Sequence, residues 1–313
     1  MDTLINVVVP VFAIVLAGYL SGYLRVLGED SAFALNRFVY YFALPPLLFA
    51  FTARAPIDEI FNWPFIFSFL LGTALTLIIA LLIGRYVLRR SDTGELALLS
   101  LSSVFANTAY MGIPLFATAF GPNGTLPAII ATLAGNTLLI GGTVATLEAA
   151  RSNSVNGAQA ILHVLRTLIR NPLLVSPVLG IAVSFTDQDI PIPIGNFLDL
   201  MAASAGPVAL FALGLSLVGR KLLGDATEVS CLVFLKLVLH PAITFLLVTY
   251  VFVMEAEWAQ AAVILSALPA GALVFVVAQQ YDVYVQRASS AIIVSTALSV
   301  VTVSVVLLFY QIS

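Results

Sequence analysis

Two interruptions in otherwise hydrophobic segments hold the residues best suited to bind a ligand. The first reads Asn107-Thr108-Ala109-Tyr110-Met111-Gly112-Ile113-Pro114, and the second reads Ala267-Leu268-Pro269-Ala270-Gly271. In hydrocarbon, every backbone N–H and C=O must be bonded within the protein. Proline removes one donor and clashes with the preceding turn, so both stretches are predicted to break their helices at membrane depth. Paired breaks are typical of secondary transporters with a binding site at the bilayer midplane.

The first interruption combines an amide with helix ends. We expect Asn107 to end one half-helix and Pro114, which suits a first helical turn, to begin the next, with Gly112 permitting the turn. Two crossed half-helices present N-terminal ends that attract carboxylates and C-terminal ends that attract cations. A proline kink stabilised by neighbouring Ser and Thr is the structural alternative. The predicted substrate-binding residues are Asn107, Thr108, Gly112, Ile113, Pro114, Pro269, Ala270, Gly271, Asn136 and Lys236.

Lys236 and His240 are the ionisable residues predicted to lie inside a span, four residues apart and so on one helix face. No Asp or Glu falls in the middle of a predicted span. A charge at membrane depth usually faces a polar cavity or a partner, so Lys236 favours an anionic ligand. Two alternatives stay open: the Lys236 side chain reaches the interface, and His240 is a hydrogen-bonded packing residue.

Polar stripes mark two further helices, with Thr132, Asn136 and Thr143 on one and Ser295, Ser299 and Thr302 on the other. Such stripes, like the small-residue motif Gly18-x-x-x-Gly22, are typical of close helix packing. Asn136 is the best ligand candidate among them. No metal site is predicted, although half-helix carbonyls with Asn136, Ser or Thr oxygens could bind sodium. The coupling ion is expected to be Na+ or H+. Exchange or facilitated diffusion without a coupling ion is the alternative.

The composition is that of a membrane protein. Of 313 residues, 61% are hydrophobic and 9% charged, with a mean hydropathy of +1.08, whereas soluble domains carry about 25% charged residues. The net charge of -3 and the absence of a basic stripe give no reason to expect a nucleic-acid partner. The single cysteine, Cys231, excludes an intramolecular disulfide. Met1-Asp2-Thr3 lacks signal-peptide features, so the first apolar run is expected to stay as a membrane helix.

Apolar runs bounded by charges, Gly and Pro predict an all-α polytopic membrane protein with ten transmembrane helices. They are expected at residues 3–24, 32–53, 63–88, 95–120, 125–148, 172–186, 196–219, 227–253, 256–280 and 286–310. The longest connection, 151–171, is expected to be cytoplasmic, either as a short interfacial helix or as a plain linker.

Positive charges predict the orientation. Of the 13 Lys and Arg residues, Arg54 alone falls on one side and Lys236 lies in a span. The remaining eleven fall in alternate connections: Arg25, Arg37, Arg85, Arg89, Arg90, Arg151, Arg166, Arg170, Arg220, Lys221 and Arg287. Because positive charges stay cytoplasmic, we expect both termini to lie outside the cytoplasmic membrane.

The two halves of the chain repeat a pattern. Ala43-Leu44-Pro45-Pro46-Leu47-Leu48-Phe49 and Ala205-Gly206-Pro207-Val208-Ala209-Leu210-Phe211 both read Ala-x-Pro-x-x-Leu-Phe. Pro114 and Pro269 hold matching places in the fourth and ninth spans. A five-helix unit is odd-numbered, so its second copy must enter the membrane inverted. We therefore expect repeats at 1–150 and 172–313, joined by 151–171.

At these residues the sequence resembles the auxin efflux carrier family, whose bacterial members include malate and malonate permeases. The likeness is carried by Asn107 to Leu115, Leu268 to Tyr281 and Arg287 to Ser299. The resemblance implies two inverted five-helix repeats as in bile-acid symporters and sodium/proton antiporters, with spans four and nine crossed in a mobile transport domain beside a scaffold. It also implies elevator-like movement, with an Asn near position 107 holding the substrate carboxylate. The plant members' long hydrophilic central loop is missing, so a small carboxylate is expected in place of auxin.

We therefore expect a secondary transporter that moves a small organic anion across the cytoplasmic membrane, with a homodimer as a possible assembly. A passive anion channel or a membrane sensor of the same fold is the alternative. An enzyme is not expected, because paired carboxylates, a zinc-binding motif or a Ser/His pair are missing from the predicted spans.

Overall fold

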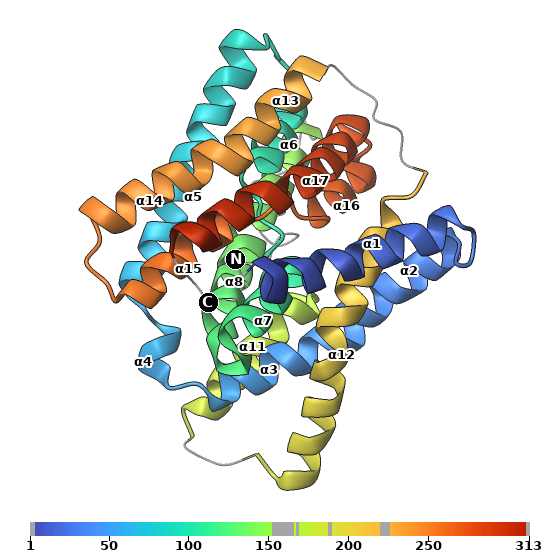
Figure 1. Ribbon diagram of the computed structural model, residues 1–313. Coiled ribbons are helices and arrows are strands. Elements are labelled where there is room, and N and C mark those ends of the chain that lie inside the picture. Colours follow the sequence, from blue (N-terminus) through green and yellow to red (C-terminus); the bar gives the residue numbers. More distant parts are fainter. Residues whose placement is uncertain (1–3, 152–165, 167–168, 187–189, 220–225, 311–313) are drawn as a thin grey trace.

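The chain is described by a computed structural model that covers residues 4–151, 166, 169–186, 190–219 and 226–310 (Figure 1). In this part of the chain the regular structure is entirely helical, apart from one isolated β-bridge. Seven helices are long and apolar enough to cross a membrane: Asn6–Tyr23, Asp30–Arg54, Ile57–Val87, Leu126–Ala150, Ile192–Ser216, Ala226–Tyr250 and Val285–Phe309.

The first half contains η1 (Leu4–Val8), α1 (Val9–Tyr23), α2 (Glu29–Phe38), η2 (Val39–Ala43), α3 (Leu44–Arg54), α4 (Ile57–Ile60), α5 (Trp63–Leu82), η3 (Ile83–Val87), α6 (Thr93–Val104), η4 (Thr108–Gly112), α7 (Ile113–Phe120), η5 (Pro122–Thr125), α8 (Leu126–Ala134), η6 (Gly135–Ile140) and α9 (Gly141–Arg151). The second half contains α11 (Pro172–Ser184), α12 (Ile192–Ser216), α13 (Ala226–Phe234), η7 (Leu235–Leu239), α14 (His240–Tyr250), α15 (Ala256–Ser266), α16 (Leu273–Tyr281) and α17 (Val285–Phe309). Here η5 is a 3-10 helix and the other η elements are π-helical.

The seven long helices coincide with seven of the ten predicted spans. The other three predicted spans correspond to shorter elements: the fourth and ninth are split, and the sixth is α11, a helix of 13 residues. Most of the connection 151–171, predicted as an interfacial helix or a plain linker, lies outside the described residues. An all-helical membrane fold is therefore established, while the complete ten-span topology belongs to the functional proposal below.

Three π-helical stretches directly precede prolines. η2 leads into Pro45 and Pro46, η4 into Pro114, and η7 into Pro241. A proline ring clashes with the carbonyl four residues earlier and offers no N–H for the hydrogen bond. A π-helical turn widens the helix at that point and shifts the bonding register, so the chain passes each proline without ending the helix.

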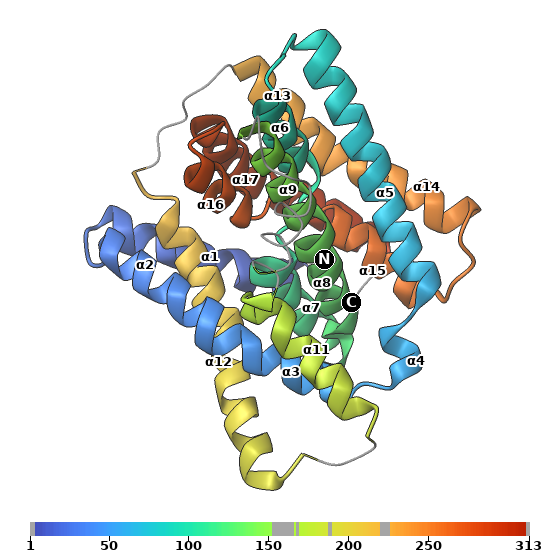
Figure 2. The ribbon, with the colours of Figure 1, turned by 180° about the vertical axis from the view of Figure 1, so that it is seen from behind.

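One packing group joins helices from both halves of the chain. α1 packs along α12, and α3 packs between α11 and α12 (Figures 1 and 2). Gly18 lies against the backbone of Phe211 on α12, so the predicted Gly18-x-x-x-Gly22 motif makes a close helix contact. On the other side of α3, the Thr52 hydroxyl lies 3.2 Å from the Pro177 carbonyl oxygen of α11. Small residues thus let these four helices approach closely.

A second hydrophobic cluster is built from α6, α9, α13, η7, α16 and α17, with Ala80 of α5. At one end of this cluster the fully buried carboxylate of Glu228 binds Arg90 at 2.7 Å and Arg287 at 2.9 Å. The Tyr284 hydroxyl donates to Glu228 at 2.7 Å. Burial raises the pKa of the Tyr284 phenol, and the hydrogen bond to Glu228 raises it further. Arg90 and Arg287, predicted to lie on one side of the membrane, therefore meet at the same carboxylate.

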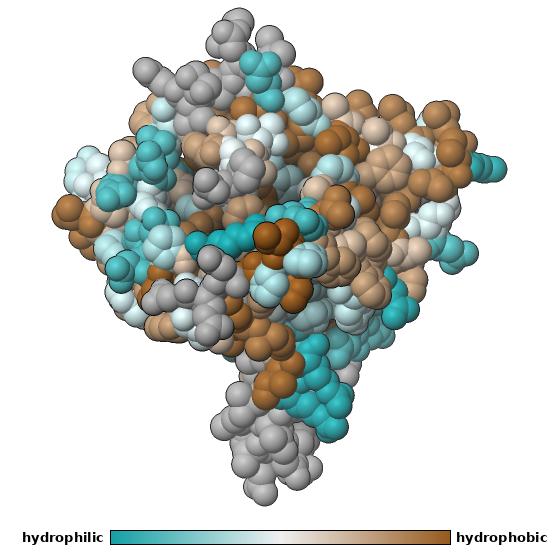
Figure 3. Space-filling model, turned by 90° about the horizontal axis from the view of Figure 1, so that it is seen from below, coloured by the Kyte–Doolittle hydropathy of each residue, from teal (hydrophilic) through white to brown (hydrophobic). Residues whose placement is uncertain are grey.

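The surface is unusually apolar for a protein in water. Many large hydrophobic side chains are exposed on the long helices, among them Val9, Phe67, Leu82, Leu200 and Val301. Figure 3 shows hydrophobic residues over much of one face, with hydrophilic residues gathered in separate groups. Soluble monomers rarely expose apolar patches this extensive, whereas lipid requires them.

We predict that Gly18→Ala destabilises the protein, whereas Gly142→Ala does not. A Cβ at Gly18 would collide with the Phe211 carbonyl and lie 3.0 Å from the Leu215 amide nitrogen, and backbone atoms cannot move aside easily. A Cβ at Gly142 meets nothing within 4 Å. We expect Gly18→Ala to lower the free energy of unfolding by about 1–3 kcal/mol. Thermal unfolding of both purified variants in detergent tests this, and equal melting temperatures would contradict it.

Candidate functional site

The two predicted interruptions cross and are hydrogen-bonded to each other. α6 ends at Val104 and helix resumes at Thr108, while α15 ends at Ser266 and α16 begins at Leu273. Between them, Ala106 and Ala270 form an antiparallel bridge. The Asn107 N–H donates to the Pro269 carbonyl and the Gly271 N–H donates to the Phe105 carbonyl, each at 2.9 Å. The crossing therefore supplies partners for backbone groups that the broken helices leave unpaired.

The first break lies earlier in the chain than predicted. We expected Asn107 to end the first half-helix and Pro114 to begin the second. Instead α6 is capped at Phe105, Asn107 is the N-cap residue of η4, and Pro114 lies within a continuous helical run from Thr108 to Phe120. The π-helical turn before Pro114 explains the difference, because it lets the helix continue through the proline. The second break, at residues 267–272, lies where it was predicted.

A buried polar centre is formed by Thr108 and Thr132, with Asn107 directly before Thr108 and Asn136 one helical turn after Thr132. The hydroxyl oxygens of Thr108 and Thr132 lie 2.8 Å apart. Asn136 follows Thr132 by four residues, which places both on the same side of their helix. Asn107 and Asn136 are each 3% exposed, yet the Nδ2 atom of each is without a hydrogen-bond partner. Buried amides are nearly always satisfied, so two unpaired ones mark a place where a ligand would find donors.

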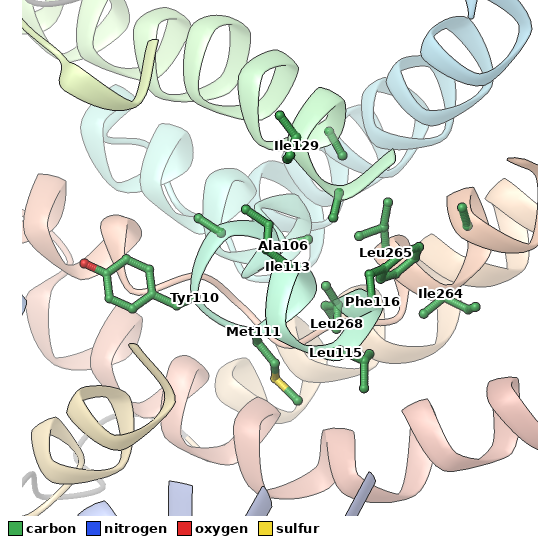
Figure 4. Close-up of a cluster of buried hydrophobic side chains, with 14 of the residues drawn as sticks. Ala106, Tyr110, Met111, Ile113, Leu115, Phe116, Ile129, Ile264, Leu265 and Leu268 are labelled. Atoms are coloured by element: carbon green, nitrogen blue, oxygen red, sulfur yellow. The ribbon is translucent and has the colours of Figure 1, made fainter. Parts of the chain in front are cut away.

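The polar centre lies at the positive end of a helix. Asn107 stands at the N-terminus of the helical run Thr108–Phe120. Peptide dipoles give such an end a partial positive charge, which stabilises an anion. The second helix of the crossing, α16, also begins there, at Leu273. Around these ends Leu265 and Leu268 of the second crossing segment pack against η4 and α7, with Phe116 beside Leu265 (Figure 4).

Lys236 lies at the opposite kind of helix end. Its side chain is fully buried, and its Nζ donates to the carbonyl of Ser266, the last residue of α15, at 2.6 Å. A cation is favoured there because the helix C-terminus carries partial negative charge. Lys236 Nζ also lies 3.4 Å from His240 Nδ1, and His240 Nε2 lies 3.2 Å from the Thr73 hydroxyl. The alternative that Lys236 reaches the interface is therefore wrong, and His240 is a hydrogen-bonded packing residue.

A cavity of about 850 Å³ lies beside the crossing, on the other side of α7. Two predicted site residues, Ile113 and Pro114, line it, whereas Asn107 and Thr108 do not. We call it the Arg54 cavity, after the basic residue at its edge. Its lining comes from α1, α3, α7, α12 and the segments near α4 and α8: Pro10, Val11, Ile14, Leu47, Ala50, Phe51, Arg54, Ala55, Pro56, Glu59, Ile113, Pro114, Ala117, Thr118, Thr125, Leu126, Asp199, Ala202, Ala203, Gly206, Pro207 and Leu210.

The structure thus brings most of the predicted residues to the crossing. Asn107 and Thr108 join Pro269, Ala270 and Gly271 there, and Asn136 lies one helical turn after Thr132, which binds Thr108. Gly112 packs toward Leu265 and Leu268, because a Cβ on it would lie 3.0 Å from Leu268 Cδ1. Lys236 instead binds the end of α15.

Sequence reasoning missed two features near the site. Thr296 on α17 is 3% exposed and its hydroxyl is without a partner, one residue after Ser295, which accepts from the Ala270 N–H at 3.1 Å. The second is the ion pair between Arg54 and Asp199 at 2.6 Å. The charge pattern had singled out Arg54, but no residue pattern indicated that Asp199, 145 positions away, would meet it. Among the described residues, no group of three or more His, Cys, Asp and Glu could hold a metal ion.

A helical membrane protein with two hydrogen-bonded, crossed helix breaks has the architecture of a transport protein. The sequence matches the Membrane transport protein family over residues 3–307, and the chain belongs to that family. It is therefore a multi-pass membrane transport protein, similar to the auxin efflux carriers.

Relatives of known description agree with this assignment. A "Putative malonate transporter" of Rhizobium meliloti is 32% identical over 97% of this chain and 95% of its own length. The "Uncharacterized transporter YfdV" of Escherichia coli is 26% identical over 94% of this chain and 93% of its own length. "Auxin efflux carrier component 5" of Arabidopsis thaliana is 23% identical over 92% and 91%.

We predict that Gly271→Ala destabilises the crossing more than Gly135→Ala. Both glycines face the Phe105 ring. A Cβ at Gly271 would lie 2.6 Å from Phe105 Cε1 and 3.3 Å from the Ala106 carbonyl oxygen, whereas one at Gly135 would lie 3.7 Å from Phe105 Cε2, an ordinary contact. We expect Gly271→Ala to cost about 1–3 kcal/mol of unfolding free energy, with a smaller change for Gly135→Ala. Thermal unfolding measures both, and the reverse order would refute the packing described for Phe105.

Proposed function

We propose that this protein is a secondary transporter that moves a small organic anion, a carboxylate, across the cytoplasmic membrane. The observation that carries the proposal is the unpaired, buried amide of Asn107 at the N-terminus of the helical run Thr108–Phe120. A carboxylate there would accept from the Asn107 amide while the helix end stabilises its charge. The description of the Rhizobium relative as a malonate transporter supports a carboxylate as cargo.

In this proposal ten spans form two inverted repeats, 1–150 and 172–313, joined by a cytoplasmic connection at 151–171. α6 with α7 forms the fourth span, α15 with α16 the ninth, and α11 the sixth. Both termini lie outside. The packing supports a division in which α1, α3, α11 and α12 form a scaffold, because these helices pack closely through small residues. The crossing, with α5, α8, α14 and α17, moves past this scaffold like an elevator.

The predicted binding residues have distinct parts in this mechanism. Asn107, Thr108 and Asn136 offer polar groups to the carboxylate. Gly112, Ile113 and Pro114 with Pro269, Ala270 and Gly271 form the frame that holds both helix ends in place. Lys236 neutralises the C-terminal end of α15 and adds positive potential. We propose Na+ or H+ as the coupling ion and a homodimer as the assembly. Imposing a gradient of each ion across liposomes and measuring uptake identifies the coupling ion.

We predict that Asn107→Ala abolishes most transport without unfolding the protein. A hydrogen bond to a charged group contributes about 1.5–3 kcal/mol, so uptake at low substrate concentration should fall roughly 10-fold or more. Stability should change little, because the Asn107 Nδ2 has no partner to lose. Radiolabelled malonate uptake into proteoliposomes measures transport, and size-exclusion chromatography measures folded protein.

Asn36→Ala is the matched control, since the Asn36 amide bonds Ala32 of its own helix, 2.8 Å away, outside the crossing. It should transport normally. Normal transport by Asn107→Ala would show that the site is assigned wrongly. Wild-type protein should also exchange internal for external malonate; uptake without such counterflow would instead indicate a passive channel.

A further inference from the structure

The Arg54 cavity combines an apolar interior with a single cation. Among the described residues that line it, Arg54 is the one basic residue. Its volume, about 850 Å³, lies within the range of about 300–1,000 Å³ found for ligand pockets. Leu47, Ala50, Phe51 and Arg54 follow one face of α3, so the apolar wall leads directly to the guanidinium. Such a lining suits a ligand with an organic body and a negative end.

Arg54 is already paired with a carboxylate in a ligand-like geometry. Its Nη1 lies 2.6 Å from Asp199 Oδ1 and its Nη2 3.2 Å from Oδ2, a two-pronged contact. Arginine forms this planar pair with any accessible carboxylate, including that of a bound anion. Asp199 therefore occupies the position that a substrate carboxylate would take.

The Arg54–Asp199 ion pair is accessible to a competing anion. The side chains of Arg54 and Asp199 are 47% and 55% exposed, so water and solutes reach both. Half-exposed ion pairs contribute little net stability, which makes replacing one carboxylate by another inexpensive. Asp199 and Glu59 both line the cavity, so an added anion gains the guanidinium of Arg54 only by displacing Asp199 from it.

The backbone that carries Arg54 is anchored to a neighbouring helix. Arg54 is the last residue of α3, and the following residue, Ala55, accepts a hydrogen bond from Ser184 of α11 at 2.8 Å. Its guanidinium lies over α12, since a Cβ at Gly195 would be 3.4 Å from Nη2. The cavity extends from there to Pro114, so an anion held at Arg54 lies at the mouth of the space that reaches the crossing.

We propose that Arg54 is an entry site for the transported anion, which binds through one carboxylate in exchange for Asp199. This inference rests on the proposed function for its cargo. Asp199 acts as an internal competitor that keeps the cation shielded until an anion arrives. From this site the anion passes to the polar centre when the crossing moves.

Equilibrium binding of radiolabelled malonate to the purified full-length protein tests this inference. Arg54→Gln removes the cation and should weaken binding about three- to fivefold, because a half-exposed ion pair contributes at most about 1 kcal/mol. Asp199→Asn removes the competitor and should strengthen binding several-fold. Arg37→Gln is the control, because Arg37 is exposed on α2 and lies over the Phe33 and Tyr41 rings, away from the cavity; it should bind as the wild type does.

Opposite changes in malonate affinity for Arg54→Gln and Asp199→Asn distinguish an entry site from a structural ion pair. If Arg54→Gln and Asp199→Asn weaken binding equally, the pair is structural and the proposal is wrong. It is also wrong if Arg54→Gln binds normally, if Arg37→Gln weakens binding as much, or if the wild type binds no malonate. Malonate counterflow separates the entry site from the proposed transport function. If the variants bind malonate in the expected order but the wild type shows no counterflow, transport is wrong and the entry site stands. If the wild type shows counterflow and Arg54→Gln binds malonate normally, the entry site is wrong and transport stands.

Discussion

The pairing of backbone groups across the two helix breaks is the interaction on which the rest of the structure depends. Extended backbone at membrane depth is tolerated only where its polar groups are satisfied within the protein. The bonds from Asn107 to Pro269 and from Gly271 to Phe105 do this reciprocally, so neither break is stable without the other. Close approach is possible because Gly271 lacks a side chain where the Phe105 ring lies. The crossing is therefore one unit made from two distant segments.

Each broken helix has ends inside the protein, and these ends carry partial charges that a continuous helix would not have there. The helical run that begins at Thr108 and the helix that begins at Leu273 direct positive ends to the crossing. At the negative end of α15, Lys236 already provides the compensating cation. The crossing therefore holds two positive helix ends, the negative end of α6 and the unpaired amides of Asn107 and Asn136, and the proposed anion site rests on the positive ends and the amides. Lys236, which was predicted to bind the ligand, therefore balances the dipole of α15 in this structure.

The sequence was sufficient to predict an all-helical membrane fold, the place of the second break and the meeting of the two breaks. Hydropathy and proline set the fold class and the second break locally, whereas the meeting of the two breaks was inferred from their matching places in the two halves and from the family resemblance. The first break was misplaced because the effect of Pro114 depends on a π-helical turn, which has no recognisable residue pattern. The contacts of Lys236 with Ser266, and of Arg54 with Asp199, join positions far apart in the chain. Such pairs depend on tertiary packing, which one sequence without relatives does not reveal.

The relation between the Arg54 cavity and the polar centre gives the proposed movement a physical basis. α7 separates them: Pro114 faces the cavity, while Asn107 and Thr108 are buried at the other end of the same helical run. Across the cavity wall Gly206 of α12 approaches Pro114, because a Cβ on it would lie 3.4 Å from the proline Cβ. On the α12 side the cavity lining includes Ala202, Ala203 and Gly206. In the proposed elevator movement α7 would shift along α12 and carry the crossing with it, because the two breaks are bonded to each other.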